Sequence, residues 1–359
     1  MGKKIRVAIA GVGNCASALI QGVYYYKNVK EDDFVPGLIH TNFGGYLPGD
    51  IEFVAAFDVD SRKIGKDLSE AIFAGNNCVK KIVDVPRMGV KVLPAPILDG
   101  VAPHMKEAFG VNEDNYEPVD VAEVLREVDA DVLISYVPVG SAEATRYYAE
   151  AALKAKVGFI NAIPEFIASD PKWGEKFEQA NVPIAGDDIK SQLGATILHR
   201  TLVELMKSRG VKILETYQLN IGGNTDFLNM TDESRLKSKR VSKTEAVTSL
   251  LPYEVPTRIG PSDYVPFLKD TKIAYIWLKG ELFGGFPVTI DVKLSVADSP
   301  DSAGTIVDVI RGVKLAIDRG VGGVLVSLSA YYFKHPPVQV PDDVARQWVE
   351  EYIEGKRLK

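Results

Sequence analysis

The stretch KKIRVAIAGVGNCASALIQGVYYY, residues 3–26, predicts the fold of the first part of the chain. An apolar strand, Lys4–Ala10, runs into a short turn, and an apolar helix, Asn14–Tyr25, follows the turn. Within it the pattern G-x-G-x-x-A is formed by Gly11, Gly13 and Ala16. The first glycine permits the tight turn, the second lets a pyrophosphate approach the backbone, and the small alanine lets the helix pack on the strand. Together with the free N–H groups of a helix N-terminus, the pattern predicts a dinucleotide-binding strand–turn–helix unit.

The second predicted strand, IEFVAAFDVD, places Asp58 where such folds hold the adenosine ribose. This acid normally follows the glycines by about 20 residues, and here it lies farther away because residues 28–50 are inserted. An acid at this position favours NAD over NADP. The alternative is that Asp58 only caps the end of its strand.

Predicted strands and helices alternate as far as about residue 200, which is typical of a parallel, doubly wound sheet. From Lys212 onward long alternating strands replace this pattern and predict an antiparallel sheet. We therefore predict an α/β fold: a Rossmann-type doubly wound parallel sheet with an inserted, mostly antiparallel α+β sheet domain. The expected divisions are an NAD-binding domain at residues 1–200, a substrate and oligomerisation sheet at 201–300, and C-terminal helices at 301–359 that return to the first domain.

Ligands bind at the carboxyl ends of the strands of such a sheet. The residues predicted to surround the cofactor there are Gly11, Gly13, Asn14, Cys15, Asp58, Ser135, Asn161, Asp187 and Asp188. The last two belong to the loop GDDIKSQLGAT, where Ser191 precedes a predicted helix and offers a second anion site. Ordinary capping by Asp and Ser is the alternative explanation of this loop.

Composition narrows the class of protein. A net charge of −6 and a pI near 5.5 disfavour broad nucleic-acid binding. Two cysteines, Cys15 and Cys78, exclude a disulfide framework, and the four scattered histidines disfavour a zinc site. No signal sequence is visible, and no apolar run approaches the ~18–20 residues that span a bilayer. We expect a soluble, cytoplasmic protein that binds neither nucleic acid nor membrane.

The segment RLKSKRVSK, residues 235–243, holds five cationic side chains in nine residues and no acid. On a helix Lys239 and Lys243 share a face, where like charges destabilise by about 0.2–0.5 kcal/mol. A bound anion between them would reverse that effect. The run therefore predicts one wall of an anion site, and a solvated surface is the alternative.

Seven phrases taken together resemble one family: GVGNCAS, GDDIKSQLGAT, LNIGGNTDFLN, SKRVSKTEAV, DTKIAYI, ADSPDSAG and YYFKHPP. The chain resembles myo-inositol-1-phosphate synthase in its short prokaryotic form, over essentially its whole length. The resemblance implies the redox-neutral conversion of glucose 6-phosphate into inositol 1-phosphate. In that family NAD⁺ oxidises C5 to a ketone, an enolate forms at C6, C6 attacks the C1 aldehyde, and NADH reduces the C5 ketone. It also implies a homotetramer assembled through the sheet domain.

The resemblance also implies roles for four lysines. Lys243 holds the phosphate, with Ser191 opposite it. Lys239 and Lys334 exchange the proton of O5, and Lys272 polarises the C1 aldehyde. A lysine can exchange protons near neutrality only if its pKa falls through burial or neighbouring cations, and a cluster of lysines supplies the second cause.

The remaining implied contacts lie in two other phrases. In LNIGGNTDF, Asn220 and Asn224 suit sugar hydroxyls, and Asp226 could bond a hydroxyl or a lysine; this chain has Thr225 where many members of the family have asparagine. In ADSPDSAG, Asp298 and Ser299 are expected near the nicotinamide amide or a divalent metal ion held by oxygen ligands. A helix cap is the alternative for Asp298.

Two other functions remain open from the sequence. An ordinary two-domain NAD-dependent sugar or semialdehyde dehydrogenase would accumulate NADH. An NAD(H)-sensing module would bind the cofactor and turn over no sugar phosphate.

Overall fold

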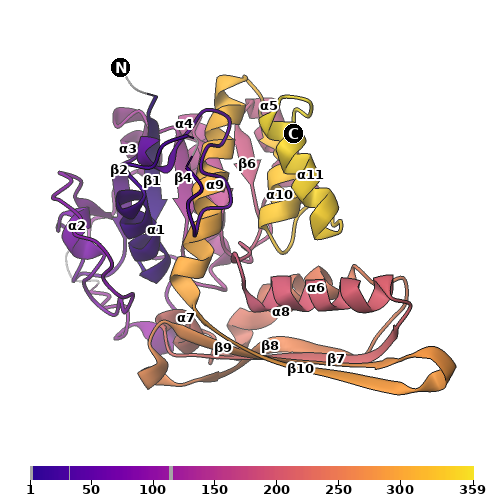
Figure 1. Cartoon of the computed structure of the whole chain (residues 1–359). Coiled ribbons are helices and arrows are strands. Elements are labelled where there is room, and N and C mark those ends of the chain that lie inside the picture. Colours follow the sequence, from indigo (N-terminus) through magenta and orange to yellow (C-terminus); the bar gives the residue numbers. More distant parts are fainter. Residues whose placement is uncertain (1–2, 32, 113–115) are drawn as a thin grey trace.

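The structure is a computed structural model that describes residues 3–31, 33–112 and 116–359. It contains a seven-stranded sheet and a separate four-stranded sheet, which lies below it in Figure 1. Helices α6 (Ala195–Ser208) and α8 (Lys237–Thr248) lie between the smaller sheet and the larger unit (Figure 1). The predicted fold class is confirmed.

The larger sheet has the strand order β11-β6-β5-β4-β1-β2-β3. Its strands are β1 (Ile5–Ala10), β2 (Ile51–Asp58), β3 (Val92–Pro94), β4 (Val132–Ser135), β5 (Gly158–Asn161), β6 (Pro183–Ala185) and β11 (Gly323–Val324). All six pairings are parallel. Because β1 and β4 are central and the order reverses there, their carboxyl ends form the crevice in which such folds bind ligands.

Two hydrophobic clusters cover the two faces of this sheet. One contains residues of α1 (Asn14–Tyr25), α2 (Leu68–Ala71), α9 (Asp298–Asp318), α10 (Val326–Tyr332) and α11 (Asp342–Ile353). The other contains residues of α3 (Val121–Glu127), α4 (Ala142–Ala155) and α5 (Pro171–Ala180). Burial of both faces fits the short, apolar strands of the sheet.

The smaller sheet has the order β10-β9-β7-β8. Its strands are β7 (Lys212–Gly222), β8 (Thr257–Tyr264), β9 (Thr271–Glu281) and β10 (Pro287–Ala297). Strand β9 is antiparallel to both neighbours, whereas β7 and β8 are parallel. The parallel pair requires a crossover, which α7 (Thr225–Asn229) and α8 supply. This crossover carries the cationic run into the space between the two sheets.

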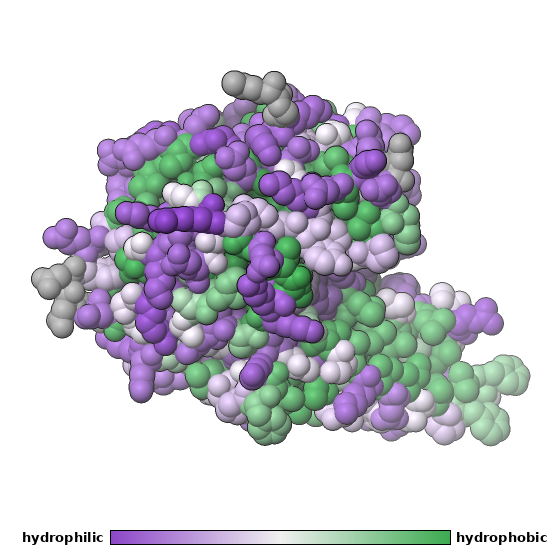
Figure 2. Space-filling model, turned by 60° about the vertical axis from the view of Figure 1, so that its left-hand side comes forward, coloured by the Kyte–Doolittle hydropathy of each residue, from purple (hydrophilic) through white to green (hydrophobic). Residues whose placement is uncertain are grey.

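One face of the smaller sheet lacks a helical cover in Figure 1. No residue of β10 is buried, and the turn after β9 exposes Phe283 and Phe286. Figure 2 shows apolar surface gathered over the far end of this sheet, at the lower right. Exposed apolar area of this kind marks an interaction surface more often than an ordinary solvated face.

The chain returns to the larger sheet through α9 and β11, which pairs with β6. Helix α2 begins only at Leu68, because Gly65 adopts a left-handed φ of +81° and Asp67 caps the helix at Ser69 N. The 3-10 helices are Pro48–Asp50, Pro103–Met105, Glu233–Leu236, Pro266–Leu268 and Phe283–Gly285. Across the described part of the chain, no helix combines the length and apolar character needed to cross a membrane.

Candidate active site

One deep pocket lies between the carboxyl ends of the parallel strands and the helices of the smaller sheet. Its empty space, which includes the open mouth, is about 1100 Å³. Thirteen of the predicted site residues line it: Gly13, Asn14, Cys15, Asp188, Ser191, Asn224, Asp226, Lys239, Lys243, Lys272, Asp298, Ser299 and Lys334. They come from segments far apart in the sequence.

The glycine-loop side of the pocket fits a dinucleotide. Helix α1 begins after Gly13, which has no side chain to cap the first N–H groups. A Cβ placed on Gly13 would find no heavy atom within 4 Å, so the backbone there faces open space. Gly11 has a φ of +92°, and a Cβ on it would lie 2.7 Å from the carbonyl oxygen of Tyr136. The two glycines therefore have the different functions that the motif predicts, a tight turn and an open approach.

Asp58 lies behind the glycine loop, outside the pocket lining. Its Oδ2 accepts a hydrogen bond from Val12 N at 2.7 Å, and its Oδ1 accepts from the amides of Val59 and Asp60. Lys63 Nζ lies 3.8 Å from Oδ2. Asp58 lies at the strand end where a ribose-binding acid was predicted. In this structure its carboxylate stabilises the conformation of the glycine loop through Val12 N.

In the loop after β6, the side chains of the two predicted aspartates, Asp187 and Asp188, have different surroundings. The carboxylate of Asp187 is fully buried and accepts hydrogen bonds from the amides of Ile167, Ala168 and Ser169. It also accepts from Asn161 Nδ2 at 2.7 Å. Asp187 is therefore held within the fold, and neither it nor Asn161 lines the pocket, although the buried Asn161 Oδ1 has no hydrogen-bond partner among the described residues.

Asp188 turns the other way, with a left-handed φ of +61°, and lines the pocket. Its Oδ1 accepts from Lys334 Nζ at 2.9 Å, and its Oδ2 accepts from Ser242 Oγ at 2.6 Å. Burial alone would raise its pKa, but Lys334 and Lys239 outweigh burial and lower the pKa to about 2. Asp188 is therefore a permanent carboxylate that joins α8 to the segment carrying Lys334.

The four lysines of the resemblance meet in this pocket. Lys239 and Lys243 come from α8, Lys272 from β9, and Lys334 from the segment after α10. Three of them pair with acids: Lys239 with Asp226 at 3.7 Å, Lys272 with Asp298 at 3.0 Å, and Lys334 with Asp188 at 2.9 Å.

Lys243 differs from the other three. It is 4% exposed, and no described carboxylate lies within 4.0 Å of its ammonium group. Burial and the neighbouring Lys272, Lys239 and Lys334 hold its pKa well below the usual 10.5. An unpaired, buried ammonium among other cations requires an anion to offset its charge.

Lys334 and Lys239 differ in the direction in which their surroundings shift the pKa. Burial, with Lys239 and Lys272 nearby, lowers the pKa of Lys334 even though Asp188 opposes the shift. Burial also acts to lower the pKa of Lys239, but Asp226, Asp188 and Asp298 outweigh it and raise the pKa. The expectation that the lysine cluster lowers the pKa of Lys239, so that it can exchange protons, is therefore wrong, because the three acids outweigh the neighbouring cations.

A small hollow beside the main pocket shows where an anion would fit. Lys243, Lys272 and Lys334 line it together with Ser191 and the first residues of α6. Helix α6 begins after Gly194, which offers no side-chain cap, so its first N–H groups and its positive dipole end face the same space. Ser191 lies three residues before this cap, slightly farther from the helix than the sequence predicted.

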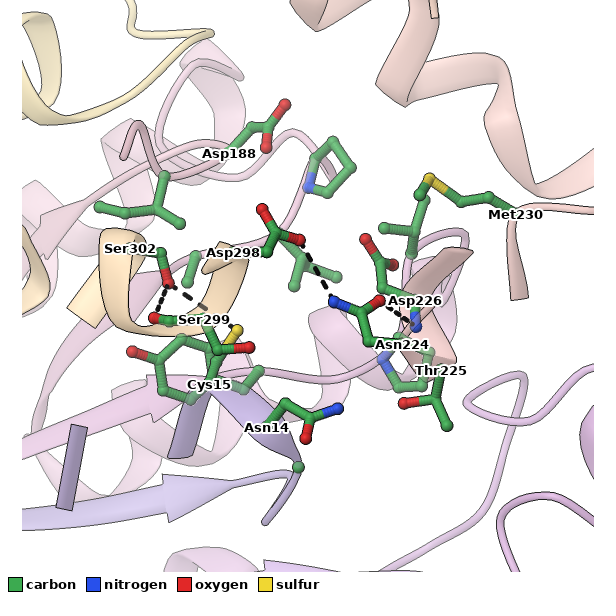
Figure 3. Close-up of a pocket in the computed structure, with 18 of the residues that line it drawn as sticks. Asn14, Cys15, Asp188, Asn224, Thr225, Asp226, Met230, Asp298, Ser299 and Ser302 are labelled. Atoms are coloured by element: carbon green, nitrogen blue, oxygen red, sulfur yellow. Dashed lines mark hydrogen bonds between the residues drawn. The ribbon is translucent and has the colours of Figure 1, made fainter. Parts of the chain in front are cut away.

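On the opposite side Asn224 and Asp298 form a second cluster (Figure 3). The Asn224 amide nitrogen donates to Asp298 Oδ2 and to Asp270 Oδ1, both at 3.3 Å, while its oxygen caps α7. Asp270 also accepts from Ser299 Oγ at 2.7 Å. Burial raises the pKa of Asp270 to about 6, whereas Lys272 outweighs burial and lowers the pKa of Asp298.

Among the described residues this cluster contains no ready-made metal centre. The Asp298 carboxylate is already shared between Lys272 and Asn224. Within residues 3–31, 33–112 and 116–359, no three His, Cys, Asp or Glu side chains form a group that could hold a metal ion. A divalent ion held by one carboxylate, water and cofactor oxygens needs no such group, so the ion expected at Asp298 and Ser299 stays a prediction.

Cys15 lines the pocket, with its sulfur 3.8 Å from Ser302 Oγ (Figure 3). Burial, with the neighbouring Asp298 and Asp270, raises its pKa to about 12. This environment favours the neutral thiol over the thiolate that a nucleophile needs.

The remaining predicted residues lie outside the lining. Asn220 is buried within β7, where its amide donates to Gly260 O at 2.9 Å, so it is not placed to contact a sugar. Ser135 ends β4, and its buried hydroxyl has no partner. That unsatisfied donor lies one residue before Tyr136, which lines the pocket, and is compatible with a ligand group bound nearby.

Sequence reasoning missed several residues that complete the site. Ser242 donates a hydrogen bond to the Asp188 carboxylate, and Asp270 accepts one from the Asn224 amide. Ser302 contacts Cys15. Asp270 begins the phrase DTKIAYI, so its spacing of two residues from Lys272 was the available signal. Ile163 lines the apolar side of the pocket and carries no polar signal at all.

Comparisons with known proteins agree with this geometry. A family model described as Myo-inositol-1-phosphate synthase matches residues 194–299. The inositol-3-phosphate synthase of Corynebacterium glutamicum is 54% identical over 97% of this chain and 98% of its own length. That of Mycolicibacterium smegmatis is 55% identical over 98% of both. The crystal structure of Ari2 aligns with a TM-score of 0.79 at 35% identity, covering 98% of this chain and 99% of that one. The chain therefore belongs to the myo-inositol-1-phosphate synthase family.

Proposed function

We propose that this enzyme cyclises D-glucose 6-phosphate to 1L-myo-inositol 1-phosphate without net oxidation, using bound NAD as a catalytic cofactor. One observation carries the proposal: three lysines from α8, β9 and the segment after α10 converge on the uncapped N-terminus of α6. A dianionic phosphate requires such a cradle, whereas a dehydrogenase acting on an unphosphorylated substrate does not.

The phosphate binds Lys243, Ser191 and the first amides of α6. Among the residues that the structure describes, Lys243 has no carboxylate partner, so a phosphate would be the counter-charge that its buried ammonium lacks. This contact orients the sugar, with its carbon chain directed toward Lys239, Lys272 and Lys334.

Lys334 and Lys239 divide the proton chemistry at O5. The lowered pKa of Lys334 makes its free amine accessible, which suits removal of the O5 proton. The raised pKa of Lys239 keeps it an ammonium that stabilises negative charge on O5 during enolisation. Asp226 lies 3.7 Å from Lys239 and holds it in place.

Lys272 polarises the C1 aldehyde for the attack by C6. Its pairing with Asp298 at 3.0 Å fixes its direction, and Asn224 fixes Asp298 in turn. When bound, NAD accepts a hydride from C5 and later returns it to the same carbon. Gly13, Asn14 and the N-terminus of α1 would bind its pyrophosphate, with Tyr136 and Ile163 against its apolar parts.

We also propose that the chain forms a homotetramer and works in the cytoplasm. The apolar face of the smaller sheet supports self-association, because β10 buries none of its residues within one chain. Sedimentation velocity at several concentrations tests this assembly.

The test of function is incubation of the enzyme with glucose 6-phosphate and NAD⁺, with the product assayed as inositol phosphate after destruction of reducing sugars. We expect product without a net change in absorbance at the NADH wavelength. Accumulating NADH would instead identify a dehydrogenase, and NAD binding without any turnover would identify a sensing module.

A further inference from the structure

A partly buried carboxylate away from the pocket, 27% exposed, connects the elements that carry the lysines. Asp342 is the first residue of α11. Its Oδ1 accepts a hydrogen bond from Lys190 Nζ at 3.0 Å, and its Oδ2 accepts from Arg200 Nε at 2.6 Å. Both cations are almost fully buried, Lys190 at 1% and Arg200 at 0% exposed. We call this group the Asp342 cluster.

Lys190 extends the cluster to the loop that carries Asp188 and Ser191. Its ammonium also donates to Ala330 O at 3.0 Å, and its backbone N–H donates to Tyr332 O at 2.7 Å. Its neighbour Ile189 accepts a hydrogen bond from Lys334 Nζ at 2.7 Å. Lys190 therefore fixes the pocket loop against the end of α10, just before Lys334.

Arg200 extends the cluster to α8. From α6 its guanidinium donates to Ala246 O, three residues beyond Lys243, and to Val340 O at 2.7 Å. Ala246 belongs to the last turn of α8, whose carbonyl groups have no partner within the helix. The planar guanidinium thus joins α6, α8 and the chain before α11, which a lysine ammonium could not do with the same geometry.

No member of the Asp342 cluster lines the pocket, so none can touch the substrate. Yet the cluster joins the three segments that supply Ser191, Lys243 and Lys334. Charge also connects these segments. Burial is the main cause that lowers the pKa of Lys190 to about 8. Arg200 and Lys334 lower this pKa further, whereas Asp342 acts to raise it.

From these contacts we infer that Asp342 is a positioning residue for the cyclisation, which acts through Lys190 and Arg200 to set the spacing of the lysines on α8 from Lys334. The inference rests on the function proposed above. It explains why an ion cluster this costly to desolvate is kept behind the site, where an apolar contact would stabilise the fold at least as well.

The test compares Arg200→Lys with Arg319→Lys. Arg200→Lys keeps the charge beside Asp342 and loses the bonds to Ala246 and Val340. Arg319 is the matched control, because it donates to Tyr352 O and Ile353 O at the other end of α11. For both variants we measure Tm, kcat, KM and the NAD dissociation constant, working below the lower Tm.

We expect Arg200→Lys to lower kcat about 10-fold or more, because displacement of reacting groups by about 1 Å can cost up to 10²-fold. NAD affinity should stay near that of the unmodified enzyme, and Arg319→Lys should keep kcat at an equal or greater loss of Tm. Asp342→Asn should lower kcat in the same way, with Asp342→Glu recovering part of it.

If Asp342→Asn does not fold, Arg200→Lys decides. A kcat for Arg200→Lys within two-fold of the unmodified enzyme overturns the inference, as does an equal fall of kcat in Arg319→Lys. Absence of glucose 6-phosphate turnover in the unmodified enzyme overturns the proposed function, and the inference with it. The two failures are therefore distinguished by the unmodified enzyme alone.

Discussion

The two sides of the pocket are built in different ways. The glycine-loop side presents backbone: Gly13, the free amides of α1 and a turn that Asp58 holds from behind. The lysine side presents side chains that come from α8, β9 and the segment after α10, and three of the four lysines are paired with acids. The first side comes from one contiguous stretch of sequence, and the second exists only after both sheets have formed.

This difference predicts different responses to mutation. Filling the space in front of the glycine loop should lower cofactor affinity. Removing a charge from the lysine side should lower turnover or substrate affinity and leave cofactor binding in place.

The largest effect is expected for Lys272→Ala. Removing the ammonium that polarises the aldehyde should lower kcat about 10²–10³-fold, the usual cost of losing one electrostatic stabiliser. NAD affinity should change much less than kcat, because Lys272 pairs with Asp298 and not with a residue of the glycine loop. Stopped-flow turnover and fluorescence titration of NADH measure the two quantities. Turnover near that of the unmodified enzyme would remove Lys272 from the mechanism.

Lys243→Ala should act mainly on substrate affinity. Loss of one charge-assisted phosphate contact should raise KM about 10–10²-fold. Lys237→Ala is the matched control, since Lys237 lies on the same helix and is exposed. Equal changes in KM for the two variants would show that α8 contributes general positive charge and no specific phosphate contact.

On the backbone side, Gly13→Ala and Gly11→Ala should separate binding from folding. Gly13→Ala places a methyl group in the space meant for the pyrophosphate and should weaken NAD binding about 10-fold with little change in Tm. Gly11→Ala forces a φ of +92° on a residue with a Cβ and should destabilise the fold by about 2 kcal/mol. Titration of NAD and thermal unfolding of both variants measure these effects. A large fall in Tm for Gly13→Ala would contradict the open space described in front of it.

The pH dependence of KM sharpens the distinction between Lys243 and an ordinary surface lysine. Burial and the cations Lys272, Lys239 and Lys334 lower the pKa of Lys243, so its ammonium is complete below that lowered pKa and is lost as the pH rises through it. KM should therefore begin to rise well below pH 10.5, the usual pKa of a lysine. Lys243→Arg keeps its charge throughout that range and should move the rise to higher pH. An unchanged profile in Lys243→Arg would assign the rise to another group.

The sequence predicts the glycine-loop side of the pocket better than it predicts the lysine side. The strand–turn–helix at residues 3–26 predicts the larger sheet correctly because its signals are local: apolar period, glycine spacing and helix start. The pairing of β7 with β8 was not predicted, because parallel pairing depends on a crossover and leaves no local pattern. The resemblance predicted which four lysines meet.

The directions of the acids were beyond the reach of the sequence. Asp187 and Asp188 are neighbours with the same chemistry, and the left-handed φ of Asp188 turns only one of them toward the pocket. The pKa of Lys239 was predicted with the wrong sign because the prediction counted neighbouring cations, whereas Asp226, Asp188 and Asp298 can be counted only in three dimensions. Residue types were therefore predictable, and their partners were not.

The smallest effect on the site is expected for Asp187→Asn. This variant tests whether Asp187 only stabilises the fold while its neighbour Asp188 belongs to the pocket. The carboxylate accepts from three backbone amides, and an amide side chain would set a donor against some of those N–H groups. Each unsatisfied donor costs about 1–3 kcal/mol, so Tm should fall clearly. NAD affinity and KM of the folded protein should stay within about two-fold of their original values, since distant, structural changes leave binding energies largely additive. A selective loss of NAD affinity without loss of Tm would return Asp187 to the cofactor site and show that its loop rearranges when the cofactor binds.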